Sequence, residues 1–105
     1  MPQIVELDNY VVDVLMRDLV GHDQRPSSVL VFLYLWRHSL GQGEKSVSAS
    51  HQTIATATGL ARRTVQSALR ELERRQLLVT RRASKTAVPE YRLRCPWRRL
   101  RGSTY

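Results

Sequence analysis

The chain has 105 residues, 42% of them hydrophobic, and carries a formal net charge of +8. This length predicts a single domain with one modest core. Neither an apolar run of about 18 residues nor a basic start followed by an apolar block is present, so we expect no membrane-spanning helix and no secretory signal. The single cysteine, Cys95, cannot form an intrachain disulfide, which favours a reducing, cytoplasmic location.

The positive charge is concentrated in one part of the sequence. Residues 1–60 contain four basic and six acidic residues, whereas residues 61–105 contain thirteen basic and three acidic ones. The two parts therefore carry net charges of −2 and +10. This division predicts a polyanion-binding surface attached to a nearly neutral packed base.

The first predicted element is a helix over 9–20, within an N-terminal helical extension that covers 1–25. Asp8 is expected to cap its start, and Gly21 is expected to end it. Its predicted apolar stripe consists of Val11, Val12, Leu15 and Leu19.

A second helix is predicted over 27–40, because Pro26 suits a first helical turn and Gly41 suits a stop. Residues 29–36 are apolar almost all round, which indicates a helix buried on more than one side. We expect it to be the central core helix and, together with the helix over 9–20, to form the interface of a homodimer.

Two further helices follow a very short strand predicted at 46–48. Ser50 is a good N-cap for the first of them, which is expected to run to about Thr58, and Gly59 supplies the sharp exit. The other helix begins near Arg62 and continues to about Gln76. Its predicted buried face is Val65, Ala68, Leu69 and Leu72, and its outer face is Arg63, Ser67, Arg70 and Arg74, with Gln66 at the edge.

A β-hairpin is predicted directly after this helix. Residues 77–82 are apolar and β-branched enough for a strand, residues 83–89 form a basic loop, and residues 90–95 alternate strictly. The alternation predicts an inner face made of Tyr91, Leu93 and Cys95.

The spacing of Ala55, Gly59 and Val65 resembles the helix-turn-helix of DNA-binding proteins. In that family the small residue lets the two helices approach, the glycine makes the turn, and the β-branched residue locks the second helix onto the first. Over about residues 26–95 the order of elements is similar to that of winged helix-turn-helix proteins. The stretch TVQSALRELERRQLLVTRR resembles GntR-type and MarR-type regulators and plasmid or phage replication initiators.

The resemblance implies an α+β fold that is mostly α: a winged helix-turn-helix, with a three-helix core plus β-hairpin wing and an extra N-terminal helix. Residues 1–105 then form one domain, in which 96–105 is a basic tail. Two positions depart from the family pattern. Ala61 stands where Ser or Thr often caps the recognition helix, so we expect a lost cap. Gln76 stands where Gly often ends that helix, so we expect either a mildly strained left-handed Gln or a different helix end.

The resemblance also implies which residues contact DNA. Arg63 is the best candidate for a guanine contact, Gln66 could pair with an adenine edge, and Arg70 and Arg74 are more suited to phosphates. The helix over 51–58 would offer His51 and Gln52 to a phosphate. The full predicted set is His51, Gln52, Arg62, Arg63, Thr64, Gln66, Ser67, Arg70 and Arg74, with Arg81, Arg82, Lys85 and Thr86 from the wing.

No convergent catalytic constellation is visible, so we predict no enzyme, no cofactor and no metal; nor is a site for a small-molecule effector evident. The expected partner is double-stranded DNA. Three roles remain open: a transcriptional regulator, a replication-initiation or plasmid-partition protein that uses the same surface, and a winged helix that mainly binds protein through residues 29–36.

Overall fold

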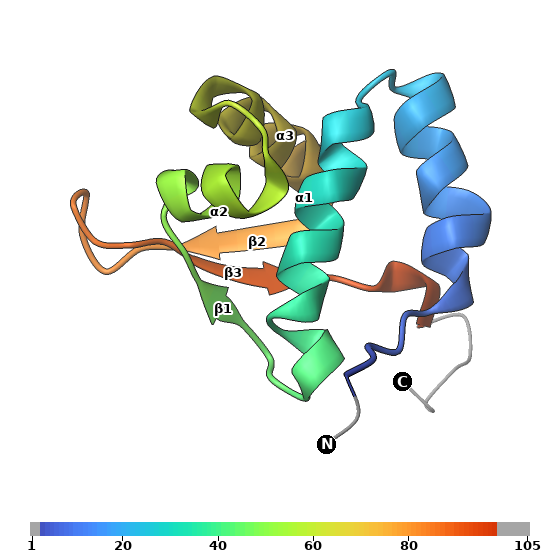
Figure 1. The fold of residues 1–105 in the computed structure, drawn as a ribbon, viewed down its shortest axis with the longest axis horizontal. Helices are drawn as coiled ribbons and strands as arrows, with labels where there is room; N and C mark the ends of the chain where they lie inside the picture. The colour runs from blue at the N-terminus through green and yellow to red at the C-terminus, as the bar shows by residue number, and fades with distance from the viewer. Residues whose placement is uncertain (1–2, 99–105) are drawn as a thin grey trace.

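The computed structural model describes residues 3–98, in which helices cover one face of a small antiparallel sheet (Figure 1). None of the helices in this part of the chain is long and apolar enough to cross a membrane. The elements are η1 (Val11–Leu15), η2 (Asp18–His22), α1 (Pro26–Arg37), η3 (Leu40–Gln42), β1 (Val47–Ser48), α2 (His51–Thr58), α3 (Arg62–Arg74), β2 (Leu78–Arg81) and β3 (Glu90–Leu93).

The N-terminal helical segment differs from its prediction in form and length. Its two stretches η1 and η2 are π-helical, and η2 includes Gly21 and ends at His22, so the prediction that Gly21 ends the helix is wrong. A π-helix holds more residues per turn than an α-helix, so side chains at i, i+4 and i+8 form one row. The buried row is Val11, Leu15 and Leu19, whereas Val12, predicted to lie in it, is 49% exposed.

Asp8 does not cap this helix with its side chain. Its carboxylate accepts hydrogen bonds from the indole Nε1 of Trp97 at 2.8 Å and from the Nε of Arg98 at 2.7 Å, while its backbone carbonyl accepts from Val11. The Arg98 hydrogen bond holds the pKa of Asp8 below its usual value, with a smaller lowering by Trp97. Trp97 also stacks on Tyr10, with ring centroids 4.8 Å apart. The carboxylate therefore joins the two ends of the described chain.

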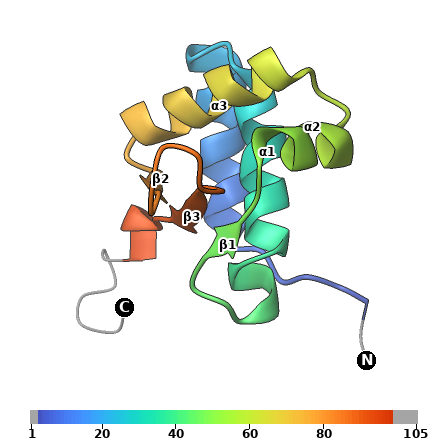
Figure 2. The same cartoon turned by 90° about the vertical axis from the view of Figure 1, so that its left-hand side faces the viewer.

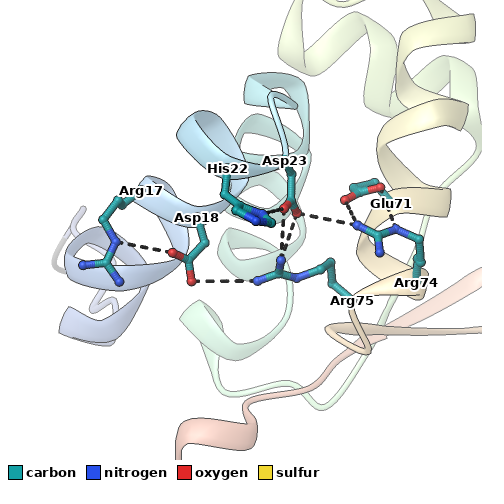
Figure 3. Close-up of polar contacts among 7 residues, drawn as sticks. All are labelled: Arg17, Asp18, His22, Asp23, Glu71, Arg74 and Arg75. Carbon is teal, nitrogen blue, oxygen red and sulfur yellow. Dashed lines mark hydrogen bonds and ion pairs between the residues drawn. The ribbon is translucent and has the colours of Figure 1, made fainter.

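The other end of the N-terminal segment is anchored to α3 through Asp23 (Figure 3). The side chain of Asp23 is only 3% exposed, and its two oxygens accept from Nη1 of Arg75 at 3.1 Å each. His22 contacts the same carboxylate at 3.0 Å, and Asp18 lies 3.8 Å from Arg75. A hydrogen bond from His22 and the neighbouring Arg75 cation hold the pKa of Asp23 below its usual value.

Helix α1 is the centre of the core, as predicted from its nearly continuous apolar sequence. It packs against α2, α3, η2, η3 and β3. It ends at Arg37 rather than Leu40, because the backbone leaves the helical conformation at His38 and Ser39. The Ser39 hydroxyl donates to the carbonyl of Leu35 at 2.6 Å. Gly41 therefore does not stop α1; it lies in η3, where an added Cβ would be 2.6 Å from Val5 and 2.9 Å from the carbonyl oxygen of Trp36.

The helix-turn-helix has the predicted local geometry. The Ser50 hydroxyl accepts from the backbone N–H of Thr53 at 3.0 Å, and Gly59 is left-handed with φ of 80°. Ala61 precedes α3 with no side-chain cap, and Gln76 has φ of 59°, so both expected departures are present. α3 ends at Arg74, two residues before the predicted end.

The sheet has the order β1-β3-β2, and both pairs are antiparallel. β2 and β3 form the predicted hairpin, although each is shorter than expected. Tyr91 and Leu93 of β3 are buried, and Cys95 beyond it is half-buried, where burial raises the pKa of its thiol to about 11. Three helices with this hairpin and an N-terminal helical segment make a winged helix-turn-helix fold (Figures 1 and 2).

We predict that Asp8→Ala lowers the free energy of unfolding by about 2 kcal/mol, because it removes hydrogen bonds from a cation and an indole. Since the folded-state pKa of Asp8 is lowered, this stabilisation is present above the usual value of 3.8 and is lost as pH falls through the folded value. Denaturant unfolding at pH 7 and at pH 3 would measure both effects. Asp13→Ala, an exposed carboxylate on the same segment, is the control. Equal stability of the two variants at pH 7 would contradict the prediction.

Candidate nucleic-acid interface

Helix α3 buries one face and exposes the other, as predicted. Its buried residues are Val65, Ala68, Leu69 and Leu72. On the outer side, Arg62, Arg63 and Arg70 are exposed, and none of their side chains forms a hydrogen bond or ion pair within residues 3–98. Thr64, Gln66 and Ser67 are half-buried beside them. This face therefore presents three cationic side chains without an internal counterion.

His51 joins α3 to the start of α2. Its Nδ1 lies 3.2 Å from Nε2 of Gln66, which fits donation by the amide to a neutral imidazole. Burial lowers the pKa of His51, and the positive charges of three arginines lower it further; they are Arg82, Arg62 and Arg70. A cation from the hairpin and two from α3 thus converge on one imidazole.

Two hollows lie along the line where α2, α3 and the hairpin meet. The first, of about 270 Å³, lies between α3 and the hairpin and has Gln66, Arg70 and Arg82 in its wall. Tyr91 also contributes to it; its ring is almost fully buried, and burial raises the pKa of its hydroxyl to about 12. The second hollow, of about 300 Å³, lies between α2 and the hairpin loop and includes Gln52 and Thr86. His51 and Arg82 line both.

The hairpin loop projects beside α2 and away from the N-terminal segment (Figures 1 and 2). Arg82 at its base donates from Nη1 to the carbonyl of Ala87 at 3.2 Å, which ties the two arms of the loop together. Lys85 and Thr86 are exposed in the loop. Among the predicted wing residues, Arg82 and Thr86 therefore lie on the same side as α2 and α3.

Two of the predicted residues are not part of this assembly. Arg74 donates to both oxygens of Glu71, at 3.1 and 2.6 Å, and lies 3.8 Å from Asp23, so its charge is neutralised within the protein (Figure 3). Arg81 lines a groove on the opposite face of the sheet, next to Val79. Arg81 and Arg82, both predicted as DNA contacts from the wing, thus line different sides of the hairpin, since adjacent residues of an extended chain point to opposite faces.

One residue of the surface was missed by the sequence analysis. Arg25, just before α1, is exposed and donates from Nη1 to the hydroxyl of Ser67 on α3 at 3.2 Å. The preceding Gln24 is left-handed, with φ of 55°, and the Arg25 N–H donates to the carbonyl of Leu19 at 2.7 Å. Arg25 and Ser67 are 42 positions apart, and Arg25 belongs to the acidic part of the sequence, so no local pattern indicates their contact.

The chemistry of this surface is that of anion binding. Guanidinium groups donate hydrogen bonds in a fixed fork and accept none, so they match phosphate or the acceptor edge of guanine. Within residues 3–98 no group of three His, Cys, Asp or Glu side chains is arranged to hold a metal ion.

The fold is that of winged helix-turn-helix domains, and its cationic outer face is suited to an anionic polymer. The sequence model of the helix-turn-helix domain family matches residues 25–78, slightly more than half of the chain, and the chain belongs to this family. Membership indicates DNA binding and confirms the resemblance carried by Ala55, Gly59 and Val65. Searches of curated proteins and of solved structures found no match.

We predict that Arg82→Gln raises the pKa of His51, because one of the positive charges that disfavour the imidazolium is removed. The pKa would be measured by following the imidazole C–H signals by NMR as pH is varied. Arg37→Gln, at the far end of α1 and not among the causes of the shift, is the control. The same His51 pKa in wild type and in Arg82→Gln would contradict the convergence described above.

Proposed function

We propose that this protein binds double-stranded DNA sequence-specifically, in the cytoplasm and associated with the nucleoid, and acts as a transcriptional regulator. The observation that carries the proposal is the set of cations on α3 that have no partner within residues 3–98, flanked by the hairpin and by the start of α2. Neither acid of α3 forms an ion pair with these cations: Glu71 is held by Arg74, and Glu73 lines the hollow beside Arg70 without pairing with it. These cations are therefore available to an external anion.

In this proposal α3 enters the major groove. A helix of about 10–12 Å diameter fits a groove about 12 Å wide. Arg63, in the first turn, is the proposed guanine contact. Gln66 is the proposed adenine contact. Its amide nitrogen is hydrogen-bonded to His51, so the orientation of the side chain is fixed before DNA binds. Such fixing lowers the entropy lost on binding.

The phosphates would be held around the edge of the same surface. On one side the candidates are Arg82, Lys85 and Thr86 of the hairpin and His51 and Gln52 at the start of α2, where free backbone N–H groups also favour an anion. On the other side Arg25 and Ser67 extend the surface past α3. Arg74 would contribute only after leaving Glu71.

The alternative of a protein-binding winged helix is less well supported by the positions of residues 29–36. Val29, Val31, Phe32, Leu35 and Trp36 are buried in the core of this chain, although Leu30 is 46% exposed. A replication-initiation or plasmid-partition role would use the DNA surface described here, and the position of the bound sites in the genome would distinguish it from regulation.

We predict that Arg63→Ala combined with Arg70→Ala weakens binding to a duplex selected from a random pool by at least about tenfold, since a bidentate guanine contact alone is worth about 1–3 kcal/mol. Fluorescence anisotropy at several salt concentrations would also show a shallower salt dependence, with the slope of log K reduced by about 0.9 for each lost phosphate contact. Arg17→Ala combined with Arg37→Ala removes the same charge elsewhere. If both double variants bound DNA like wild type, the recognition surface would be wrongly assigned.

We also propose a homodimer formed through the N-terminal segment. Val12, Met16 and Val20 form a row beside the buried one and are 49%, 36% and 42% exposed. The segment lies on the side of α1 away from the hairpin, so pairing there would leave the DNA surface open (Figure 1). An antiparallel pairing about a two-fold axis near Met16 would set each Val12 against Val20 of the other copy.

We predict that Met16→Glu converts the protein to a monomer, because two carboxylates would meet near the two-fold axis. Sedimentation velocity at micromolar concentration would measure this, with Val88→Glu, a 56% exposed valine in the hairpin loop, as the control. A wild-type protein that sediments as a monomer under these conditions would remove the dimer from the proposal.

A further inference from the structure

The sheet has an outer face that the helices do not cover. Along β2 and β3 the side chains alternate, so Leu78, Tyr91 and Leu93 are buried while Val79, Arg81 and Arg92 are exposed on the other side. An open groove of about 630 Å³ runs over this face. Its cationic lining is Lys45, Arg81, Arg92 and Arg94.

The four cations of this outer face lack internal counterions. Within residues 3–98 none of their side chains forms a hydrogen bond or an ion pair. Glu90 also lines the groove and is in register with Arg81, but its carboxylate accepts from the hydroxyl of Ser46 at 2.9 Å. The groove therefore has an excess of positive charge even when Glu90 is counted. Bringing like charges together is unfavourable, and an external anion relieves that cost.

Some other arginines of the described chain differ from these four cations, because each of them pairs with a carboxylate of the same chain. Arg75 is held by Asp23, Arg98 by Asp8, and Arg74 by Glu71. Two clusters without such partners remain in the described part of the chain: the outer face of α3 and the outer face of the sheet. They lie on different sides of the hairpin, since Arg82 faces the first and Arg81 faces the second.

We propose that the outer face of the sheet binds the phosphate backbone of a second segment of duplex DNA, so that one protein joins two segments. The inference rests on the proposed function, because DNA bound at α3 supplies further segments of the same polymer at high local concentration. Arg92 and Arg94 are two residues apart near one strand, about 7 Å along it, which spaces their guanidinium groups for successive contacts along a phosphate chain. No aromatic ring is among the groove's lining, so backbone contacts rather than base stacking would hold the DNA.

The test is a bridging assay with two duplexes. One duplex, carrying the selected site, is immobilised on beads, and a second duplex of unrelated sequence carries a fluorophore. Arg92→Ala combined with Arg94→Ala is expected to bind the immobilised duplex within about twofold of wild type, but to capture the fluorescent duplex about tenfold less. Arg17→Ala combined with Arg37→Ala, with the same loss of charge, is expected to capture it like wild type. Thermal unfolding of both variants checks that they are folded.

Several results would overturn the inference while leaving the proposed function intact. One is a wild-type protein that binds the immobilised duplex and captures no second duplex. Another is capture by the Arg92, Arg94 double variant at the wild-type level, which would mean that a dimer bridges through its two α3 surfaces. Displacement of the second duplex by polyglutamate at much lower concentrations than those of unlabelled duplex needed for the same displacement would assign the groove to an acidic protein. Failure of wild type to bind even the immobilised duplex would instead remove the proposed function and this inference together.

Discussion

The packing of α3 against the other helices is the constraint on which the rest depends. Val65, Ala68, Leu69 and Leu72 are buried, and burial of each large side chain is worth about 1.5–3 kcal/mol relative to exposure. Because the helix has 3.6 residues per turn, fixing this row also fixes which residues point outward. The core therefore determines the orientation of Arg63 and Arg70, although neither residue belongs to it.

The arginines of the chain fall into two groups: some pair with carboxylates of the same chain, and others have no such partner within the described residues. Arg75 and Arg98 are held by Asp23 and Asp8, and these pairs attach the N-terminal segment to the residue after α3 and to the segment that follows β3. Of the two carboxylates only Asp23 is buried, with 3% of its side chain exposed, so loss of Arg75 would leave a buried charge unpaired. The arginines on α3 lack such partners within the described chain and are available to an anion. Counting basic residues alone does not separate these two groups.

The sequence was sufficient where local rules determine structure. The Ser50 cap, the Gly59 turn, the outward face of α3 and the left-handed Gln76 all depend on residues within a few positions of one another. Periodicity and capping report such short-range preferences directly. The hairpin was also predicted, because alternation along β3 is a local signal.

The features that were missed depend on contacts across the chain. Asp8 is sequestered by residues about 90 positions away, and Arg25 meets Ser67 only after α1 and α3 have packed. The ion pair between Arg74 and Glu71 was missed for a different reason. The two residues are neighbours on the helix, but a charged residue at i+3 can either share an exposed face or form a pair, and the sequence pattern does not decide between them. The π-helical form of the N-terminal segment has no signal in its apolar pattern that we recognise.

The most direct test of the account is an NMR titration that follows the side-chain Nε–H signals of arginine while a selected duplex is added. The account predicts large shifts for Arg63 and Arg70 at the first equivalent of DNA, with Arg75 and Arg98 unchanged. Shifts confined to Arg75, Arg98 or the N-terminal segment, with Arg63 and Arg70 unaffected, would contradict it.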